Sequence, residues 1–116
     1  MNDILIIANA KLARLNRDND FTQINTFNGL RLAVATKSAN YTLTDLDNVV
    51  VFTATATATL PVATGTGQTY RIVNDSIGGT VTIDGNGTDT IKQSLTQTLA
   101  SGEDLLLTDY KTGAWI

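Results

Sequence analysis

The side chains that could do acid–base chemistry in this chain are carboxylates, tyrosines, lysines and hydroxyls, because the sequence contains neither histidine nor cysteine. Histidine is the commonest general base and the commonest metal ligand, and cysteine is a frequent nucleophile and zinc ligand. Their absence excludes serine–histidine and cysteine–histidine catalysis, ordinary zinc sites and disulfide bonds. An enzyme such as a glycan hydrolase would require two carboxylates that face each other across a cleft.

Two pairs of neighbouring carboxylates are the first candidates for such chemistry. Asp45 and Asp47 lie in the stretch TDLDN, and Glu103 and Asp104 follow Ser101-Gly102. Both stretches are short and polar, which is typical of turns between strands. We therefore interpret all four acids as solvated turn residues and predict that the chain is not an enzyme and uses no cofactor.

The stretch Asp84-Gly-Asn-Gly-Thr-Asp89 resembles the start of a calcium-binding loop, with oxygen ligands at alternate positions. It departs from the EF-hand pattern, because its sixth residue is Asp89 rather than Gly and its twelfth is Leu95 rather than Glu. We predict a polar turn and no metal site, with weak calcium binding as the alternative. Gly65-Thr-Gly67 is followed by no lysine, so it is not a phosphate-binding loop.

The aromatic residues are few, and they could serve either packing or recognition. Tyr41, Phe52, Tyr70 and Trp115 each lie within an apolar strand pattern, so we predict that they fill the core. The alternative is an exposed aromatic cluster that stacks on sugars, as at a receptor-binding tip.

Residues 38–116 have the pattern of short strands. Thr is the most frequent residue of the chain, and its branched side chain suits a pleated surface. Val49 to Phe52 is a continuous apolar run, which predicts a fully buried strand. Thr53 to Leu60 alternates strictly, with alanines on one face and threonines on the other, and Pro61 ends it. Turn residues recur roughly every 8–12 positions, so we predict an all-β fold, a compact sandwich or barrel of short antiparallel strands.

Residues 1–37 differ from the rest of the chain and are predicted to form an N-terminal arm. They carry five basic and three acidic residues, whereas residues 38–116 carry three basic and eight acidic ones. A segment from Ile4 to Leu15 fits one helical face, but Ile4 to Ile7 also suits an extended strand, so a short helix and a β arm both stay open. Leu30 to Ala35 alternates like a strand.

The arm has more apolar surface than is stable in water, so we expect it to attach to a capsid or to a neighbouring subunit. Its basic charge is too weak and too scattered for nucleic acid, and no apolar stretch has the length of a membrane span. The N-terminus lacks the pattern of a signal peptide. The expected contact residues are Ile4, Leu5, Ile6, Ile7, Leu12, Leu15, Phe21 and Phe27.

The ordered set of strand and turn motifs over residues 41–116 resembles a small β module of bacteriophage virion surface proteins. The residues that carry the resemblance are Tyr41-Thr-Leu43-Thr, Thr59-Leu60-Pro61, Gly67, Tyr70-Arg-Ile72-x-Asn74, Thr80-Val-Thr-Ile83, Asp89-x-Ile91, Thr98-Leu99, Ser101-Gly102 and Gly113-x-Trp115. Asn25-Thr-Phe27-Asn-Gly29 is also similar to repeats that precede trimeric tail-fibre modules.

This resemblance implies a structural component of the virion surface, made in the bacterial cytoplasm and often a homotrimer. One module without a long shaft is more typical of a capsid decoration (cement) protein or head fibre than of a long tail fibre. The leading expectation is thus a trimer that binds the major capsid protein and stabilises the head. The alternative is a tail-fibre module that attaches to host-surface glycan. The resemblance carries over no catalytic or ligand-binding residue.

Overall fold

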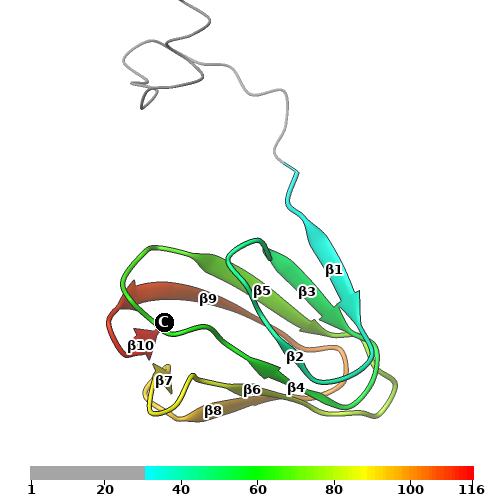
Figure 1. Cartoon of the computed structure of the whole chain (residues 1–116). Coiled ribbons are helices and arrows are strands. Elements are labelled where there is room, and N and C mark those ends of the chain that lie inside the picture. Colours follow the sequence, from blue (N-terminus) through cyan, green and yellow to red (C-terminus); the bar gives the residue numbers. More distant parts are fainter. Residues whose placement is uncertain (1–30) are drawn as a thin grey trace, which may run out of the picture. The chain divides into compact units, whose positions relative to one another are not determined.

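The computed structural model describes residues 31–116, which form one unit of the chain. This unit is all-β, with two mixed sheets and no helix among the described residues (Figure 1). The strands are β1 (Val34–Lys37), β2 (Tyr41–Thr42), β3 (Val49–Phe52), β4 (Ala56–Thr59), β5 (Thr69–Asn74), β6 (Val81–Asp84), β7 (Thr90–Ile91), β8 (Thr96–Leu99), β9 (Asp104–Lys111) and β10 (Ala114–Trp115).

The two sheets are built from strands that alternate along the chain. The larger sheet has the order β1-β3-β5-β9-β10-β7, and the smaller one has the order β2-β4-β6-β8. From β1 to β6 the chain crosses to the other sheet after every strand, and each strand pairs in parallel with the next but one. Antiparallel pairs follow these parallel ones in each sheet: β9 pairs with β5, and β8 pairs with β6.

The prediction of an all-β fold is confirmed, but the predicted antiparallel pairing is wrong for most strands. We interpreted the regular turn residues as hairpins, which join neighbouring strands of one sheet. In the structure most of those turns are corners at which the chain passes from one sheet to the other. Parallel neighbours require such crossovers, because a tight turn cannot join them.

The described unit begins before residue 38, at which we expected the β module to start. β1 pairs with β3 over its whole length, from Val34↔Val49 to Lys37↔Phe52. The strand expected at Leu30 to Ala35 thus begins four residues later and ends two residues later than predicted. The helix or strand expected at Ile4 to Leu15 lies outside the described residues.

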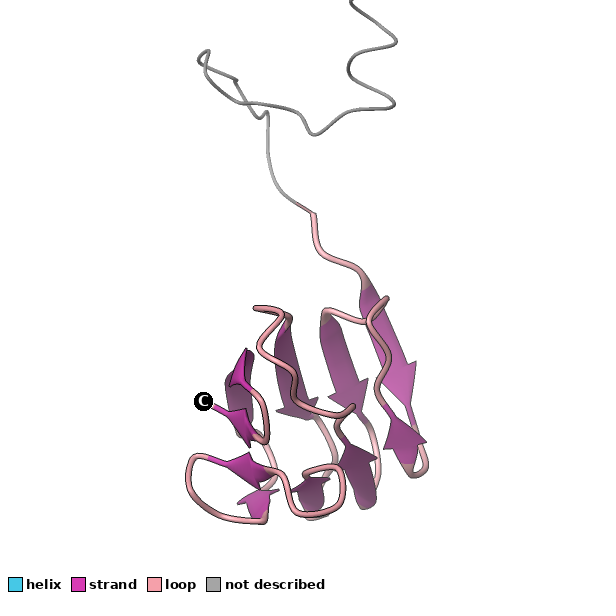
Figure 2. Cartoon of the chain, turned by 60° about the vertical axis from the view of Figure 1, so that its left-hand side comes forward, coloured by secondary structure: helices cyan, strands magenta, loops and turns pink. Residues whose placement is uncertain are grey.

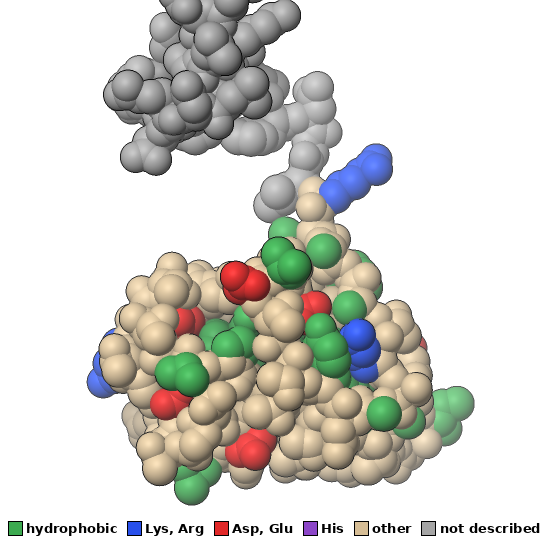
Figure 3. Space-filling model, in the orientation of Figure 1, with side chains coloured by type: hydrophobic (Ala, Val, Ile, Leu, Met, Phe, Trp, Pro, Cys, Tyr) green, Lys and Arg blue, Asp and Glu red, His purple; other side chains and the backbone are tan. Residues whose placement is uncertain are grey.

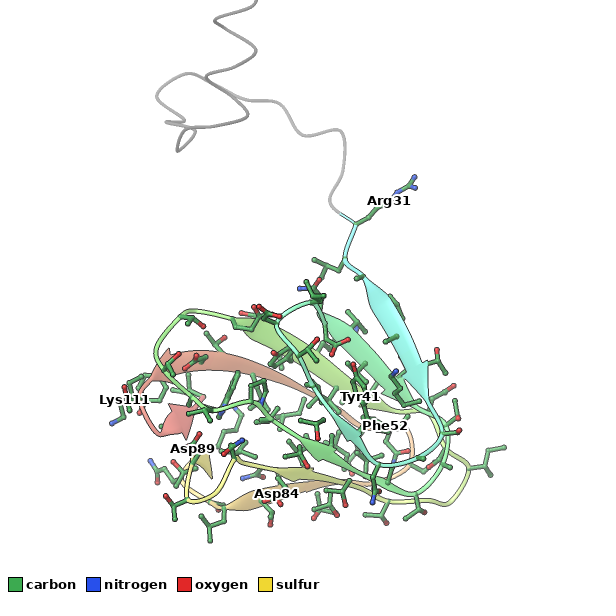
Figure 4. The ribbon with its side chains drawn as sticks, viewed as in Figure 1. Arg31, Tyr41, Phe52, Asp84, Asp89 and Lys111 are labelled. Carbon is green, nitrogen blue, oxygen red and sulfur yellow. The ribbon has the colours of Figure 1, made fainter. Side chains whose placement is uncertain are left out.

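The core lies between the two sheets and draws side chains from both. Phe52 and Ile72 of the larger sheet and Ala58 and Ile83 of the smaller sheet have no exposed surface. Figure 4 shows Phe52 between the two layers. Leu60 follows β4 and is equally buried. This cluster of apolar side chains supplies the main favourable free energy of folding.

The alternating threonine–alanine segment has the two faces that were predicted, but the strand it forms is shorter than predicted. Ala56 and Ala58 are buried, and the threonines between them lie on the other face. Thr53 still donates its N–H to Lys37 O of the larger sheet, at 2.9 Å, whereas Ala56 donates to Thr80 O of the smaller sheet, at 3.2 Å. The segment between Thr53 and Ala56 is therefore a corner, which an alternating pattern does not reveal.

β3 has the predicted bounds, but the prediction that it is fully buried is wrong. Val50 and Phe52 point into the core, whereas Val49 and Val51 keep part of their surface exposed on the opposite face. A continuous apolar run is typical of a parallel strand that is covered on both faces. The described part of the chain covers only one face of β3.

Candidate functional site

Asp109 is the most deeply buried carboxylate in the described residues, and it organises a loop. Its side chain is 2% exposed and accepts hydrogen bonds from the backbone N–H groups of Thr64, Gly65 and Thr66, at 2.7 to 3.2 Å, and from Thr66 Oγ1 at 2.9 Å. Burial alone would raise the pKa of Asp109, but these hydrogen bonds favour the charged form more strongly and lower the pKa. The carboxylate is therefore ionised, and both of its oxygens accept hydrogen bonds from the loop.

Asp47 stabilises a second loop, to which the hydroxyl groups of Tyr41 and Tyr70 also contribute hydrogen bonds. Its Oδ2 accepts hydrogen bonds from Tyr41 Oη at 2.8 Å and from the Thr44 N–H at 2.9 Å. The hydrogen bond to Asp47 is the main reason why the pKa of Tyr41 is raised. Burial, followed by the charge of Asp47, raises the pKa of Tyr70 to about 12, and its hydroxyl donates to Thr44 O at 2.7 Å. Asp47 is thus a structural turn residue, but a buried one rather than the solvated one predicted.

The calcium-like stretch forms a turn, and its two aspartates serve different elements. Asp84 ends β6, whereas Asp89 Oδ2 accepts the N–H of Ala63 at 2.8 Å. Figure 4 shows the two side chains well apart. No group of three potential metal-ligating side chains occurs among residues 31–116. The predicted polar turn is confirmed by the turn between β6 and β7.

The second pair of neighbouring acids also has structural partners. Glu103 Oε1 accepts the N–H of Ala100 at 2.9 Å, which closes the turn before β9. Asp104 forms a surface ion pair with Arg71, with 2.9 Å between Oδ2 and Nε. Both side chains of that pair are about half exposed. Exposed pairs of this kind contribute little to stability, typically below about 1 kcal/mol.

Two clefts open on the described unit, and each contains some of the residues considered above. The first has a volume of about 330 Å³ and is lined by Asp45, Gln68, Tyr70, Asp109 and Trp115, among others. It brings two carboxylates, Asp45 and Asp109, into one cleft. A general acid has to be protonated before it acts, and the lowered pKa of Asp109 opposes that role.

The second cleft, of about 290 Å³, is lined by Lys92, Gln93, Tyr110 and Trp115, among others. Tyr110 is 48% exposed there, so its ring is accessible to solvent. Phe52, Tyr70 and Trp115 are at most 2% exposed, which confirms them as core residues, whereas Tyr41 is only partly buried and packs against that core.

Asn74, one of the motif residues, is a buried amide with a structural role. Its Nδ2 donates to Gly79 O at 3.0 Å and to Leu99 O at 2.9 Å, and its Oδ1 accepts Ser76 Oγ at 2.6 Å. A buried amide with all these partners fixes the turn between β5 and β6. This motif residue thus positions strands rather than a ligand.

The open edges of the two sheets are the feature that the sequence did not predict. β1 is the first strand of its sheet and β2 is the first strand of the other, and no described segment lies beyond either (Figures 1 and 2). Ala33 O and Lys37 O accept hydrogen bonds from Val49 and Thr53. The alternation of a parallel ladder then turns the N–H and C=O groups of Val34 and Thr36 away from β3.

Charge is sparse on the described unit. Figure 3 shows a surface of mostly uncharged polar and backbone atoms with scattered acidic, basic and apolar side chains. Among the described residues no helix is long and apolar enough to cross a membrane. The predicted contact residues Ile4, Leu5, Ile6, Ile7, Leu12, Leu15, Phe21 and Phe27 lie outside the described residues.

A comparison of the sequence with protein-family models and with curated proteins gives no match. The arrangement of the described residues is therefore the basis for a functional argument, together with the motifs of the sequence.

Proposed function

We propose that this chain is a non-enzymatic structural subunit of a bacteriophage particle, a trimeric capsid decoration protein that binds the head and stabilises it. Its two sheets pack face to face as a small β-sandwich, and the N-terminal residues that precede β1 attach the subunit to the capsid. The proposal combines the resemblance over residues 41–116 with the open edge at β1.

The open edge is the observation that carries an assembly role. The backbone groups of Val34 and Thr36 that point away from β3 can pair with a strand of another protein. β1 is short and ends with Lys37, whose Nζ lies 4.0 Å from the centre of the Tyr41 ring. A short edge strand with a terminal lysine resists unspecific pairing, so a partner that pairs here has to be specific.

The carboxylates support the same proposal in a different way. Asp47 and Asp109 accept hydrogen bonds from their own loops, and Asp104 is paired with Arg71. Each of these groups has a structural role that explains its position. The proposal therefore needs no catalytic step.

Deletion of residues 1–20 tests the arm. We expect phage heads that lack the protein to bind the full chain saturably and to release or ignore the truncated chain, because the apolar contact residues Ile4 to Leu15 are removed. Co-sedimentation with heads measures this. Substitution of Thr98 by Lys on the β module is the control and should leave binding unchanged. Binding of the truncated chain at the level of the full chain would contradict the proposal.

A further inference from the structure

The face of the larger sheet that points away from the core carries a group of apolar side chains, beside the polar side chains of Thr36, Thr69 and Thr108. Register places Val34 beside Val49, and Val51 beside Val73, and Leu106 lies directly opposite Arg71. We call Val34, Val49, Val51, Val73 and Leu106 the outer valine face. Val34 is 65% exposed and Leu106 is 59% exposed, while the three central valines are partly exposed.

The sequence patterns of the two sheets also differ. In the smaller sheet, core residues alternate with polar ones, as in Ala56–Thr59 (ATAT) and Val81–Asp84 (VTID). Its outer face is therefore made of threonines and Asp84, with Thr57 beside Thr82 and Thr82 beside Thr98. That face suits contact with water.

Two strands of the larger sheet, β3 and β9, contain continuous apolar runs, whereas β5 alternates. β3 reads VVVF, and β9 contains the run Leu105 to Leu107, of which Leu107 is buried and Leu106 points outward. Strands with continuous apolar runs are typical of sheets that are covered on both faces. Contiguous apolar surface on one face of a small protein marks an interaction site.

The charges on the same face indicate what covers it. Arg71 and Asp104 are the charged residues among those that register places on this face, and they lie side by side. Because Arg71 and Asp104 already neutralise each other through their ion pair, this face suits a partner surface without a strong net charge, such as that of another copy of the same chain.

We propose that the outer valine face is the contact between copies of this chain in a closed symmetric oligomer. The contact buries apolar side chains, and closed symmetry allows each copy to use the same face. This inference identifies the surface through which copies of the chain contact one another, and it rests on the proposed structural role. It requires neither a phage head nor residues 1–20 at the contact.

Substitution of Leu106 by Lys in the full chain tests the proposal. We expect sedimentation equilibrium to give a mass of several chains for the unsubstituted protein and roughly tenfold or greater weakening of self-association for the variant. The double variant Val51→Thr, Val73→Thr is the second test and should also weaken self-association. Threonine keeps the shape and strand preference of valine while it adds a hydroxyl to the contact.

Substitution of Thr98 by Lys is the matched control. Thr98 is exposed on the outer face of the smaller sheet, so the same change there should leave the mass unaltered. Circular dichroism shows whether each variant keeps its sheets. A single-chain mass of the unsubstituted protein at all soluble concentrations would overturn the proposal and assign the face to residues 1–30 or to another protein. An unchanged mass of the folded Leu106→Lys variant would also overturn it. Head binding is measured separately, so failure of the capsid role is distinguishable from failure of the self-contact.

Discussion

Asp109 shows what can and cannot be predicted for a single residue of this chain. The sequence places it two residues after the apolar run Leu105 to Leu107 of β9, but its hydrogen-bond donors lie at Thr64 to Thr66, far away along the chain. Such a long-range pairing leaves no local pattern. The aromatic core residues Phe52, Tyr70 and Trp115 were predictable, because each lies in an apolar pattern that itself indicates burial.

Substitution of Asp109 by Asn should destabilise the protein by about 2 kcal/mol at neutral pH, because an amide group replaces one of the accepting oxygens and the loop N–H groups lose hydrogen bonds to a charged group. Urea unfolding at pH 7 measures the change in the free energy of unfolding. Substitution of Asp104 by Asn is the control and should cost less than about 1 kcal/mol, since its ion pair with Arg71 is exposed.

The effect of Asp109→Asn on stability has a predictable pH dependence. The pKa of Asp109 is lowered in the folded protein, so its contribution is complete above the unfolded pKa of about 3.8 and is lost as pH falls through the folded pKa. The gap in stability between the unsubstituted protein and Asp109→Asn should therefore shrink below pH 4. A constant gap down to pH 2 would contradict this role of the charge.

At the scale of elements, strand positions were easier to predict than strand partners. β3 has the bounds of its apolar run, because a run of valines fits little else than a strand. The partners were missed, because turn residues mark where a strand ends and do not tell whether the chain returns in the same sheet or crosses to the other. The face of β3 that was expected to be buried is part of the outer valine face.

Proline substitutions in β1 test the orientation of the edge. Thr36 turns its N–H away from β3, so Thr36→Pro removes no hydrogen bond of the ladder and should cost less than about 1 kcal/mol. Ala35 turns its N–H toward β3, and Ala35→Pro should cost about 1–3 kcal/mol, because it removes a ladder hydrogen bond and leaves its acceptor without a partner. Thermal unfolding of both variants measures the difference. Equal losses of stability in the two variants would contradict this orientation of the β1 backbone, in which Ala35 and not Thr36 turns its N–H toward β3.

At the scale of the whole molecule, the composition predicted an all-β unit, and the structure confirms it for residues 31–116. Thr-rich alternation and the lack of long helical patterns suffice for that prediction. The winding of the chain between two sheets was not predictable, since it depends on which strands meet. The proposed role rests on the resemblance over residues 41–116 and on the open edge of β1, and the outer valine face is the proposed contact between copies.

The proposed role depends on a symmetric oligomer, and the mass of the unsubstituted protein in solution tests this most directly. Light scattering at micromolar concentration should give three times the 12.4 kDa of one chain. A trimer would agree with three copies that bury their outer valine faces around one axis. A mass of 12.4 kDa that persists as the concentration is raised would contradict the oligomer and, with it, the proposed capsid decoration trimer.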